Sequence, residues 1–317
     1  MDIDMLQRRA AIIRNVRSFF DSRNYLELDT PLLSADLIPE SCLEVFKTER
    51  LYPHGCKKES KPLYLVPSPE IWMKKIIAQH RVNVYQICKC FRNGESSGRL
   101  HNSEFTMLEY YTMDAGYLDS LSLTEELFSC LLKNNDLLPF ERITVAQAFE
   151  KHAGFDLFRV AGNAKAMEKE ARRLGLDPIP DLTIAQLYDL IFIHAVEPHL
   201  KHEKPVALLD YPAFVPCLAE LSPNGRTVER WELYHGGIEL ANCFSEETDP
   251  QKVKDFFISE EAAKAGNAIV PHKVDRDYWK IFESFPRCSG VAMGLDRLIM
   301  ALTGKADIDG VLPFVLD

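Results

Sequence analysis

The 317-residue sequence predicts a fold in which helical and strand segments occupy separate stretches of the chain. Three observations indicate this. Apolar residues recur at helical spacing over about residues 6 to 23, and a strand hairpin is expected over 82 to 111. The stretch from 119 to 200 has helical periodicity, whereas 206 to 246 returns to strand patterns. Two more helices are expected near the end, over 250–264 and 275–285.

The first expected helix presents six apolar side chains as one buried stripe: Leu6, Ala10, Ile13, Val16, Phe19 and Phe20. Residues 24–33 follow it and read as a short strand that ends in Thr30-Pro31. A helix followed by such a strand is common, so on its own it says little about function.

The expected hairpin has an unusually charged connection. Its first strand, residues 82–91, alternates as a half-buried strand should. The continuation, residues 91–111, reads FRNGESSGRLHNSEFTMLEYY and contains two arginines, one histidine and three acids. These charges exceed what a simple turn needs, which indicates a functional loop.

Residues 288–297 read CSGVAMGLDR, a run of small residues that leads an arginine into a helix. Gly290, Ala292 and Gly294 allow backbone to lie close to a ligand. Arg297 offers a permanent cation with a planar face, suited to phosphate and to a purine ring. Taken alone, such a run more often serves packing.

In this order, residues 24–33, 91–111 and 288–297 resemble motifs 1, 2 and 3 of the class II aminoacyl-tRNA synthetases, and the FTMLE sequence is closest to the lysyl branch. Residues 229–246 and the Ser-Pro-Glu at 68–70 resemble further lysyl-synthetase segments. The resemblance spans nearly the whole chain. It implies an α+β class II catalytic domain with an antiparallel β-sheet flanked by helices, a helical insertion at about 115–205, and a homodimer.

The chain is most similar to truncated lysyl-tRNA synthetase paralogues, a group that attaches lysine or (R)-β-lysine to a lysine of translation elongation factor P. We expect no anticodon-binding domain, because the helix before motif 1 begins almost at Met1. The net charge of −10 has the wrong sign for gripping RNA, so tRNA is not the expected partner. Ala292 stands where lysyl synthetases carry glycine. We hypothesise that its methyl group shifts the preference between α- and β-lysine.

The resemblance also implies a set of site residues, with ATP and Mg²⁺ as cofactors. A guanidinium can hold two oxygens of the transferring phosphate, so Arg92 and Arg297 are the expected catalytic residues. The expected ATP-binding residues are Arg92, Asn93, Gly94, Glu95, His101, Asn102, Phe105, Glu239, Leu240, Gly294 and Arg297. An ammonium substrate needs acids and hydroxyls, and the expected lysine-binding residues are Ser68, Pro69, Glu70, Glu109, Tyr111, Asn242, Glu246 and Ala292. Hard carboxylate oxygens suit Mg²⁺, for which Glu232 and Glu239 are expected.

Two features of the sequence leave a choice open. Gly94 precedes Glu95 at the start of motif 2, so either position can align with the functional glutamate of the family. Cys243 is expected beside the pocket, and we favour a packing role over an exposed thiol.

The eight cysteines include a C-x-C at Cys88 and Cys90 but no C-x-x-C pair. Together with the lack of a signal peptide, this predicts reduced thiols in a cytoplasmic protein, without a zinc site. No apolar run approaches the length that spans a membrane.

Two other functions remain as alternatives. The chain could be a catalytic-domain lysyl-tRNA synthetase that charges tRNA or another acceptor. It could also be a non-catalytic regulatory paralogue, although intact Arg92, Glu239, Glu246 and Arg297 argue against that function.

Overall fold

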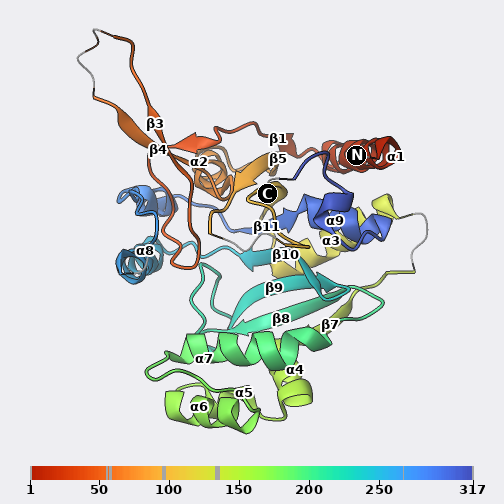
Figure 1. Cartoon of the computed structure of the whole chain (residues 1–317), viewed down its shortest axis with the longest axis vertical. Coiled ribbons are helices and arrows are strands. Elements are labelled where there is room, and N and C mark those ends of the chain that lie inside the picture. The colour runs from red at the N-terminus through yellow and green to blue at the C-terminus, as the bar shows by residue number, and fades with distance from the viewer. Residues whose placement is uncertain are drawn as a thin grey trace. The chain divides into compact units, whose positions relative to one another are not determined.

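The computed structural model describes residues 2–54, 56, 59–94, 98–132, 136–266 and 268–315 (Figure 1). The chain divides into two compact units, the first formed by Met1–Ala115 with Glu247–Asp317 and the second by Gly116–Glu246. Each unit is described by itself below.

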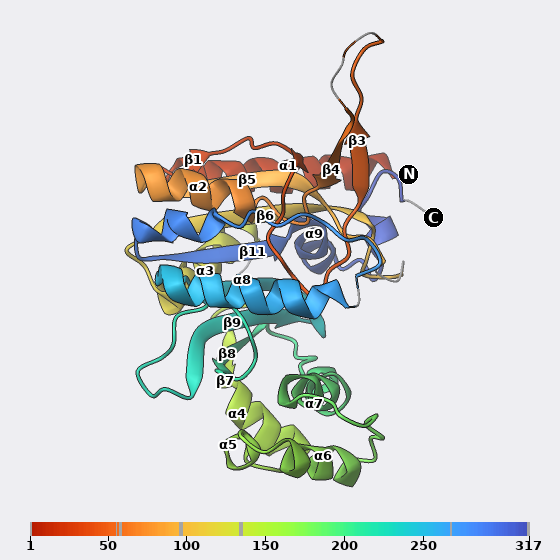
Figure 2. The same ribbon diagram turned by 90° about the vertical axis from the view of Figure 1, so that its left-hand side faces the viewer.

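The first unit contains a four-strand arrangement in the order β1-β5-β6-β11, made of β1 (Leu26–Glu27), β5 (Val84–Phe91), β6 (Glu104–Met113) and β11 (Cys288–Gly294). β1 is parallel to β5, and the other neighbours are antiparallel. A smaller sheet in the order β2-β4-β3 is made of β2 (Leu33–Ser34), β4 (Lys61–Leu65) and β3 (Lys47–Arg50). Both views show β3 and β4 reaching away from the rest of this unit (Figures 1 and 2).

The helices of the first unit include α1 (Ile3–Asp21), α2 (Glu70–His80), α8 (Pro250–Ala265) and α9 (Leu295–Thr303), with 3₁₀ turns at Tyr278–Glu283 and Ile308–Gly310. Asp2 caps α1 by accepting the backbone N–H of Asp4 at 3.0 Å. Phe20, on this helix, is buried, and its ring stacks on that of Tyr85 in β5 with the centroids 4.8 Å apart. The expected apolar stripe is therefore mostly inward, but Ala10 is exposed.

The second unit contains β7 (Glu141–Thr144), β8 (Val206–Pro212), β9 (Thr227–His235) and β10 (Ile238–Ser245) in the order β10-β9-β8-β7, with β7 parallel to β8. Its helices include α3 (Tyr117–Leu131), α4 (Val145–Ala148), α5 (Leu157–Val160), α6 (Ala164–Arg173) and α7 (Ile184–Ile191), with π-helical turns at Phe149–Ala153 and Phe192–Val196 and a 3₁₀ turn at Glu197–His199. Both views show α4 to α7 gathered beside β7 and β8 (Figures 1 and 2). Phe149 and Tyr188 stack in the core between them, with centroids 5.2 Å apart.

The predicted α+β fold is confirmed, and the predicted hairpin appears as β5 and β6. The sequence did not reveal α2. This helix buries Lys74 together with Ile71, Met73 and Ile77, so a charged residue interrupts its apolar stripe. None of the described helices combines the length and apolar character needed to cross a bilayer.

Candidate functional site

Strand register in the first unit gathers motif 2 and motif 3 side chains on one face. Glu109 of β6 pairs with Gln86 of β5 and with Ala292 of β11. Directly paired residues of antiparallel strands point to the same face, so the Ala292 methyl group lies beside Glu109. Alternation along β6 places Phe105 and Tyr111 on this face as well.

Glu109 and Gln86 carry buried polar atoms that suit a ligand. Glu109 is 2% exposed and Gln86 is 1% exposed. The Tyr111 hydroxyl donates to Glu109 Oε1 at 2.7 Å, but Oε2 and both amide atoms of Gln86 have no hydrogen-bond partner among the described residues. A buried polar group left unpaired costs about 1–3 kcal/mol. These atoms therefore fit a polar ligand that binds between them, and the sequence had not singled out Gln86.

A second carboxylate approaches the same cluster from α2. Glu70 is the first residue of this helix, Pro69 is its N-cap, and Ser68 precedes it. Lys74, only 1% exposed, donates to Glu70 Oε1 at 2.6 Å. Burial, and after it the charge of Glu70, raises the pKa of Glu109 well above its ordinary value. One buried lysine thus faces two carboxylates, and an ammonium ligand would supply a second positive charge.

Arg92 follows β5 and remains on the face described above. Its backbone N–H donates to the Ser103 carbonyl at 3.0 Å, which continues the hairpin ladder past the end of the strand. The Arg92 guanidinium lies over the Phe105 ring, 5.3 Å from the ring centroid. A guanidinium over an aromatic face is attracted to the ring, and its N–H groups can still bind oxygen ligands.

Asn93, the next residue of motif 2, is hydrogen-bonded to the loop before β3, and Gly94 is hydrogen-bonded to Asn93. The Asn93 backbone N–H donates to the Glu44 carbonyl at 2.9 Å, and its amide nitrogen donates to the Val45 carbonyl at 3.3 Å. Gly94 has a φ of +70°, which favours glycine, and its N–H donates to Asn93 Oδ1 at 2.9 Å. The predicted residue Glu95 lies outside the described residues.

Motifs 2 and 3 meet at Arg297, in the first turn of α9. An Arg297 amino group lies 2.7 Å from His101 Nε2, and Arg297 Nε donates to the Leu100 carbonyl at 3.3 Å. Arginine can only donate, so His101 Nε2 is the acceptor in this contact. Asn102 donates to the Glu104 carbonyl at 2.7 Å, which shapes the turn that carries His101. Gly294 ends β11 and is the N-cap of α9.

A buried ion pair holds α9 against β6. Asp296 accepts the Thr106 backbone N–H at 2.7 Å and pairs with Arg9 of α1 at 2.6 Å. This pair fixes the start of the helix that carries Arg297. The sequence had not revealed it, because Arg9 and Asp296 lie almost at opposite ends of the chain.

The second unit has its own polar cluster, on β9 and β10. Glu232 pairs with Asn242 across these strands. Arg230 donates to Glu232 through a short hydrogen bond and to Asn242 Oδ1 at 3.2 Å, and its guanidinium lies 4.2 Å from the Tyr211 ring centroid. The Tyr234 hydroxyl donates to Glu232 Oε2 at 2.6 Å. Both oxygens of Glu232 are therefore engaged by protein groups.

Glu239 pairs with Tyr234, so it shares a face with Glu232. Within the described ranges, no group of three or more His, Cys, Asp or Glu side chains could hold a metal by itself. Magnesium commonly takes one or two carboxylates and completes its shell with phosphate oxygens and water. Two carboxylates on one face fit a magnesium ion that arrives with a nucleotide.

The remaining predicted residues of the second unit are mostly buried. Leu240 and Cys243 are both buried on β10. The burial of Cys243 agrees with the packing role favoured from the sequence. Glu246 is buried at the end of this segment, in an isolated bridge with Ala219.

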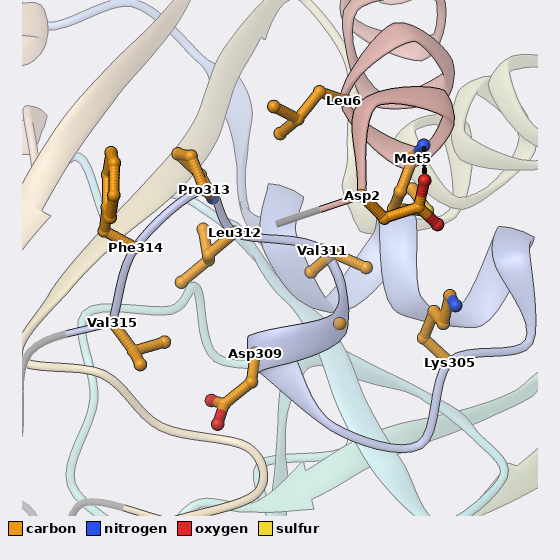
Figure 3. A pocket seen from close by; sticks show the side chains of 11 residues that line it. Asp2, Met5, Leu6, Lys305, Asp309, Val311, Leu312, Pro313, Phe314 and Val315 are labelled. Atoms are coloured by element: carbon orange, nitrogen blue, oxygen red, sulfur yellow. Dashed lines mark hydrogen bonds between the residues drawn. The ribbon is translucent and has the colours of Figure 1, made fainter.

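A pocket in the first unit involves none of the predicted site residues (Figure 3). It has a volume of about 470 Å³ and lies between the start of α1 and the segment 309–315. Most of its side chains are apolar, among them Met5, Leu312 and Phe314. It offers no chemistry related to the polar clusters above.

Comparisons with known proteins cover nearly the whole chain. A family model described as tRNA synthetases class II (D, K and N) matches residues 3–317. A protein of Vibrio atlanticus named elongation factor P–(R)-β-lysine ligase is 36% identical over 319 residues, covering 98% of this chain and 95% of the relative. A protein of the same name from Salmonella paratyphi B is 35% identical, covering 99% of this chain and 96% of the relative. The chain therefore belongs to the class II tRNA synthetases of the D, K and N group.

Proposed function

We propose that this chain activates (R)-β-lysine or lysine with ATP and transfers it to a lysine side chain of translation elongation factor P. The names of the Vibrio and Salmonella relatives support this acceptor and this substrate. The observation that carries the substrate class is the buried carboxylate of Glu109, whose free oxygen lies on the face that also holds Arg92. An amino acid with more than one ammonium group suits a site with so many acids.

In the first step, a carboxylate oxygen of the substrate forms a bond to the α-phosphorus of ATP, and the bond to pyrophosphate breaks. Arg92 is positioned to hold the substrate carboxylate and the α-phosphate together, which contributes by orientation and charge neutralisation. Arg297 binds a more distant phosphate or the adenine, with His101 orienting its guanidinium through the 2.7 Å contact. Asn93, Gly94 and Asn102 shape the loop around the nucleotide.

The substrate amine near the carboxylate binds between Glu109 and Glu70. The ionised Glu109 accepts from the ammonium through its free oxygen, and the Tyr111 hydroxyl steadies the other oxygen. Ser68 and Pro69 place Glu70 at the start of α2. The resemblance assigns the side-chain ammonium to Glu246 with Asn242, and these roles remain predictions.

Glu232 and Glu239 would hold Mg²⁺, which when bound neutralises phosphate charge. Arg230 and Tyr234 keep the Glu232 carboxylate in a fixed orientation. In the second step of the reaction, the amine of the acceptor lysine attacks the activated carbonyl carbon, an amide bond forms and AMP leaves. We also keep the homodimer as a prediction, to be checked by sedimentation.

The test is ATP–pyrophosphate exchange with α-lysine and with (R)-β-lysine, followed by mass spectrometry of elongation factor P added to the same mixture. Exchange together with a mass gain on the factor is the expected result, and the preferred isomer identifies the substrate. Exchange without transfer would contradict the acceptor, and charging of added tRNA would then favour the synthetase alternative. A complete lack of exchange would favour a non-catalytic paralogue.

A further inference from the structure

Strand β5 carries two cysteines whose thiols touch. Cys88 is partly exposed and Cys90 is buried, and their sulfur atoms lie 3.8 Å apart. They are separated by one residue on an extended strand, so both point to the same face. The family resemblance gives these thiols no role.

This face is the one that carries the candidate site. Cys90 pairs with Phe105 and Cys88 pairs with Met107, on the same side of β6 as Glu109. Arg92 comes two residues after Cys90, which keeps its side chain on this side as well. The thiol pair is therefore adjacent to the guanidinium that is expected to hold the reacting groups.

The two thiols differ in acidity. The hydrogen bond from Cys90 lowers the pKa of Cys88, and the same contact, together with burial, raises the pKa of Cys90 well above its ordinary value. Cys88 is thus the better nucleophile and the more accessible of the two, while Cys90 retains its proton beside it. Redox-sensitive cysteines commonly combine an accessible, acidic thiol with a neighbouring second thiol.

We propose that Cys88 and Cys90 form a peroxide-sensitive modification site that switches off amino-acid activation. The Cys88 thiolate attacks one oxygen of hydrogen peroxide and the O–O bond breaks. Cys88 becomes a sulfenic acid, and the hydroxide that leaves takes up a proton from solvent and becomes water. The Cys90 thiol then attacks the Cys88 sulfur, a disulfide forms and a second water leaves. The peroxide is reduced by two electrons, and the two thiols together are oxidised by two.

The consequence for activity follows from strand geometry. Two residues of an extended strand span about 6.6 Å, which is longer than the commonest separation of roughly 5.5–6 Å between the Cα atoms of a disulfide. Closing the bridge therefore pulls on β5 just before Arg92, which displaces its guanidinium from Phe105. A disulfide strained in this way is easily reduced, so the change is reversible. The loss of activity rests on the proposed function, whereas formation of the bridge does not.

A tryptic digest tests the bridge directly. Cleavage after Arg81, Lys89 and Arg92 places Cys88 in peptide 82–89 and Cys90 in peptide 90–92. After treatment of the folded protein with hydrogen peroxide and capping of free thiols, we expect a linked pair of these peptides that dithiothreitol separates. Unlinked peptides, or a sulfinic acid at Cys88 alone, would overturn the proposal whether or not the protein is active.

Pyrophosphate exchange tests the consequence on the same samples. We expect the wild type to lose at least nine tenths of its exchange rate in peroxide and to regain it with dithiothreitol. In peroxide, the Cys88→Ser and Cys90→Ser variants should each keep most of the exchange rate that the same variant shows without peroxide. Cys130→Ser removes an exposed thiol elsewhere and should respond like the wild type. Loss of the rate in both serine variants would refute the switch, because another group would then be the target.

Discussion

Each of the two units contains a buried glutamate in a polar cluster, and the two carboxylates differ in how many of their oxygens are hydrogen-bonded. In the first unit, Glu109 has one oxygen engaged by Tyr111 and one without a partner among the described residues. In the second unit, both oxygens of Glu232 are engaged, one by Arg230 and one by Tyr234. Both carboxylates lie on strands and each accepts from a tyrosine two residues along the same strand. The difference is the arginine.

This difference separates a carboxylate whose charge a ligand must balance from one whose charge the protein already balances. A buried carboxylate that shares its nearest cation with a second carboxylate, as Glu109 shares Lys74 with Glu70, is costly to ionise, so it gains most from a ligand that brings positive charge. A carboxylate that already has an arginine is held in place before any ligand arrives. We therefore expect changes at Glu109 to act on substrate affinity, and changes around Glu232 to act on the stability of the fold.

The largest effect is expected from Arg230→Met. This change leaves Glu232 buried without its cation, which should lower the free energy of unfolding by about 3–5 kcal/mol. Urea denaturation measures the loss. The matched control is Arg142→Met in the same unit, whose pair with Glu125 leaves Arg142 44% exposed and should contribute no more than about 1 kcal/mol. If both variants lose the same free energy of unfolding, the buried pair of Arg230 with Glu232 contributes no more than an exposed ion pair.

The second effect concerns affinity at Glu109. Glu109→Gln keeps the shape but removes the charge, so KM for the lysine substrate should rise roughly 10–100-fold, as expected for a charged hydrogen bond of about 1.5–3 kcal/mol. Stability should change little or increase, since burial already disfavours the ionised form. Steady-state exchange kinetics and urea denaturation measure both quantities. Glu104 is a half-buried acid on the same strand, paired with Lys89 at 3.2 Å, and Glu104→Gln should leave KM within about twofold of the wild type. A normal KM in Glu109→Gln would place the amine elsewhere.

Features that depend on neighbouring residues could be predicted from the sequence, whereas contacts between residues far apart in the chain could not. The hairpin and the strand–helix step before Arg297 follow from local patterns, whereas Glu109 was expected only from the family resemblance. The structure brings Arg297 of motif 3 to His101 of motif 2. Gln86 was not predicted, because its place opposite Glu109 depends on strand register. The burial of Lys74 was not predicted, because a lysine is normally expected on the surface and the helix α2 that carries it was not predicted either. Register and buried ion pairs are tertiary properties that no local pattern encodes.

A third prediction concerns pH and extends the contrast to another acid of the first unit. Burial, followed by the charge of Glu70, raises the pKa of Glu40 from 4.5 to about 7. Between these values the folded chain keeps a proton that the unfolded chain has released. The free energy of unfolding should therefore fall as pH rises through this window, with the loss complete above pH 7. Glu40→Gln should remove about 1–3 kcal/mol of this fall. Urea denaturation at a series of pH values measures this difference. If the free energy of unfolding falls equally with pH in the wild type and in Glu40→Gln, Glu40 is not desolvated.

The smallest effect is expected at Ala292, which pairs with Glu109 and places one methyl group beside it. Moving an amine from the α to the β carbon changes where the ammonium meets this carboxylate, so the methyl group can favour one isomer by contact alone. Ala292→Gly should change the ratio of kcat/KM for (R)-β-lysine and α-lysine by about fivefold, corresponding to about 1 kcal/mol. Ala241→Gly removes a buried methyl group from the second unit and should lower stability without changing this ratio. If the ratio is the same in Ala292→Gly and wild type, selectivity depends on the acids and not on the shape around Glu109.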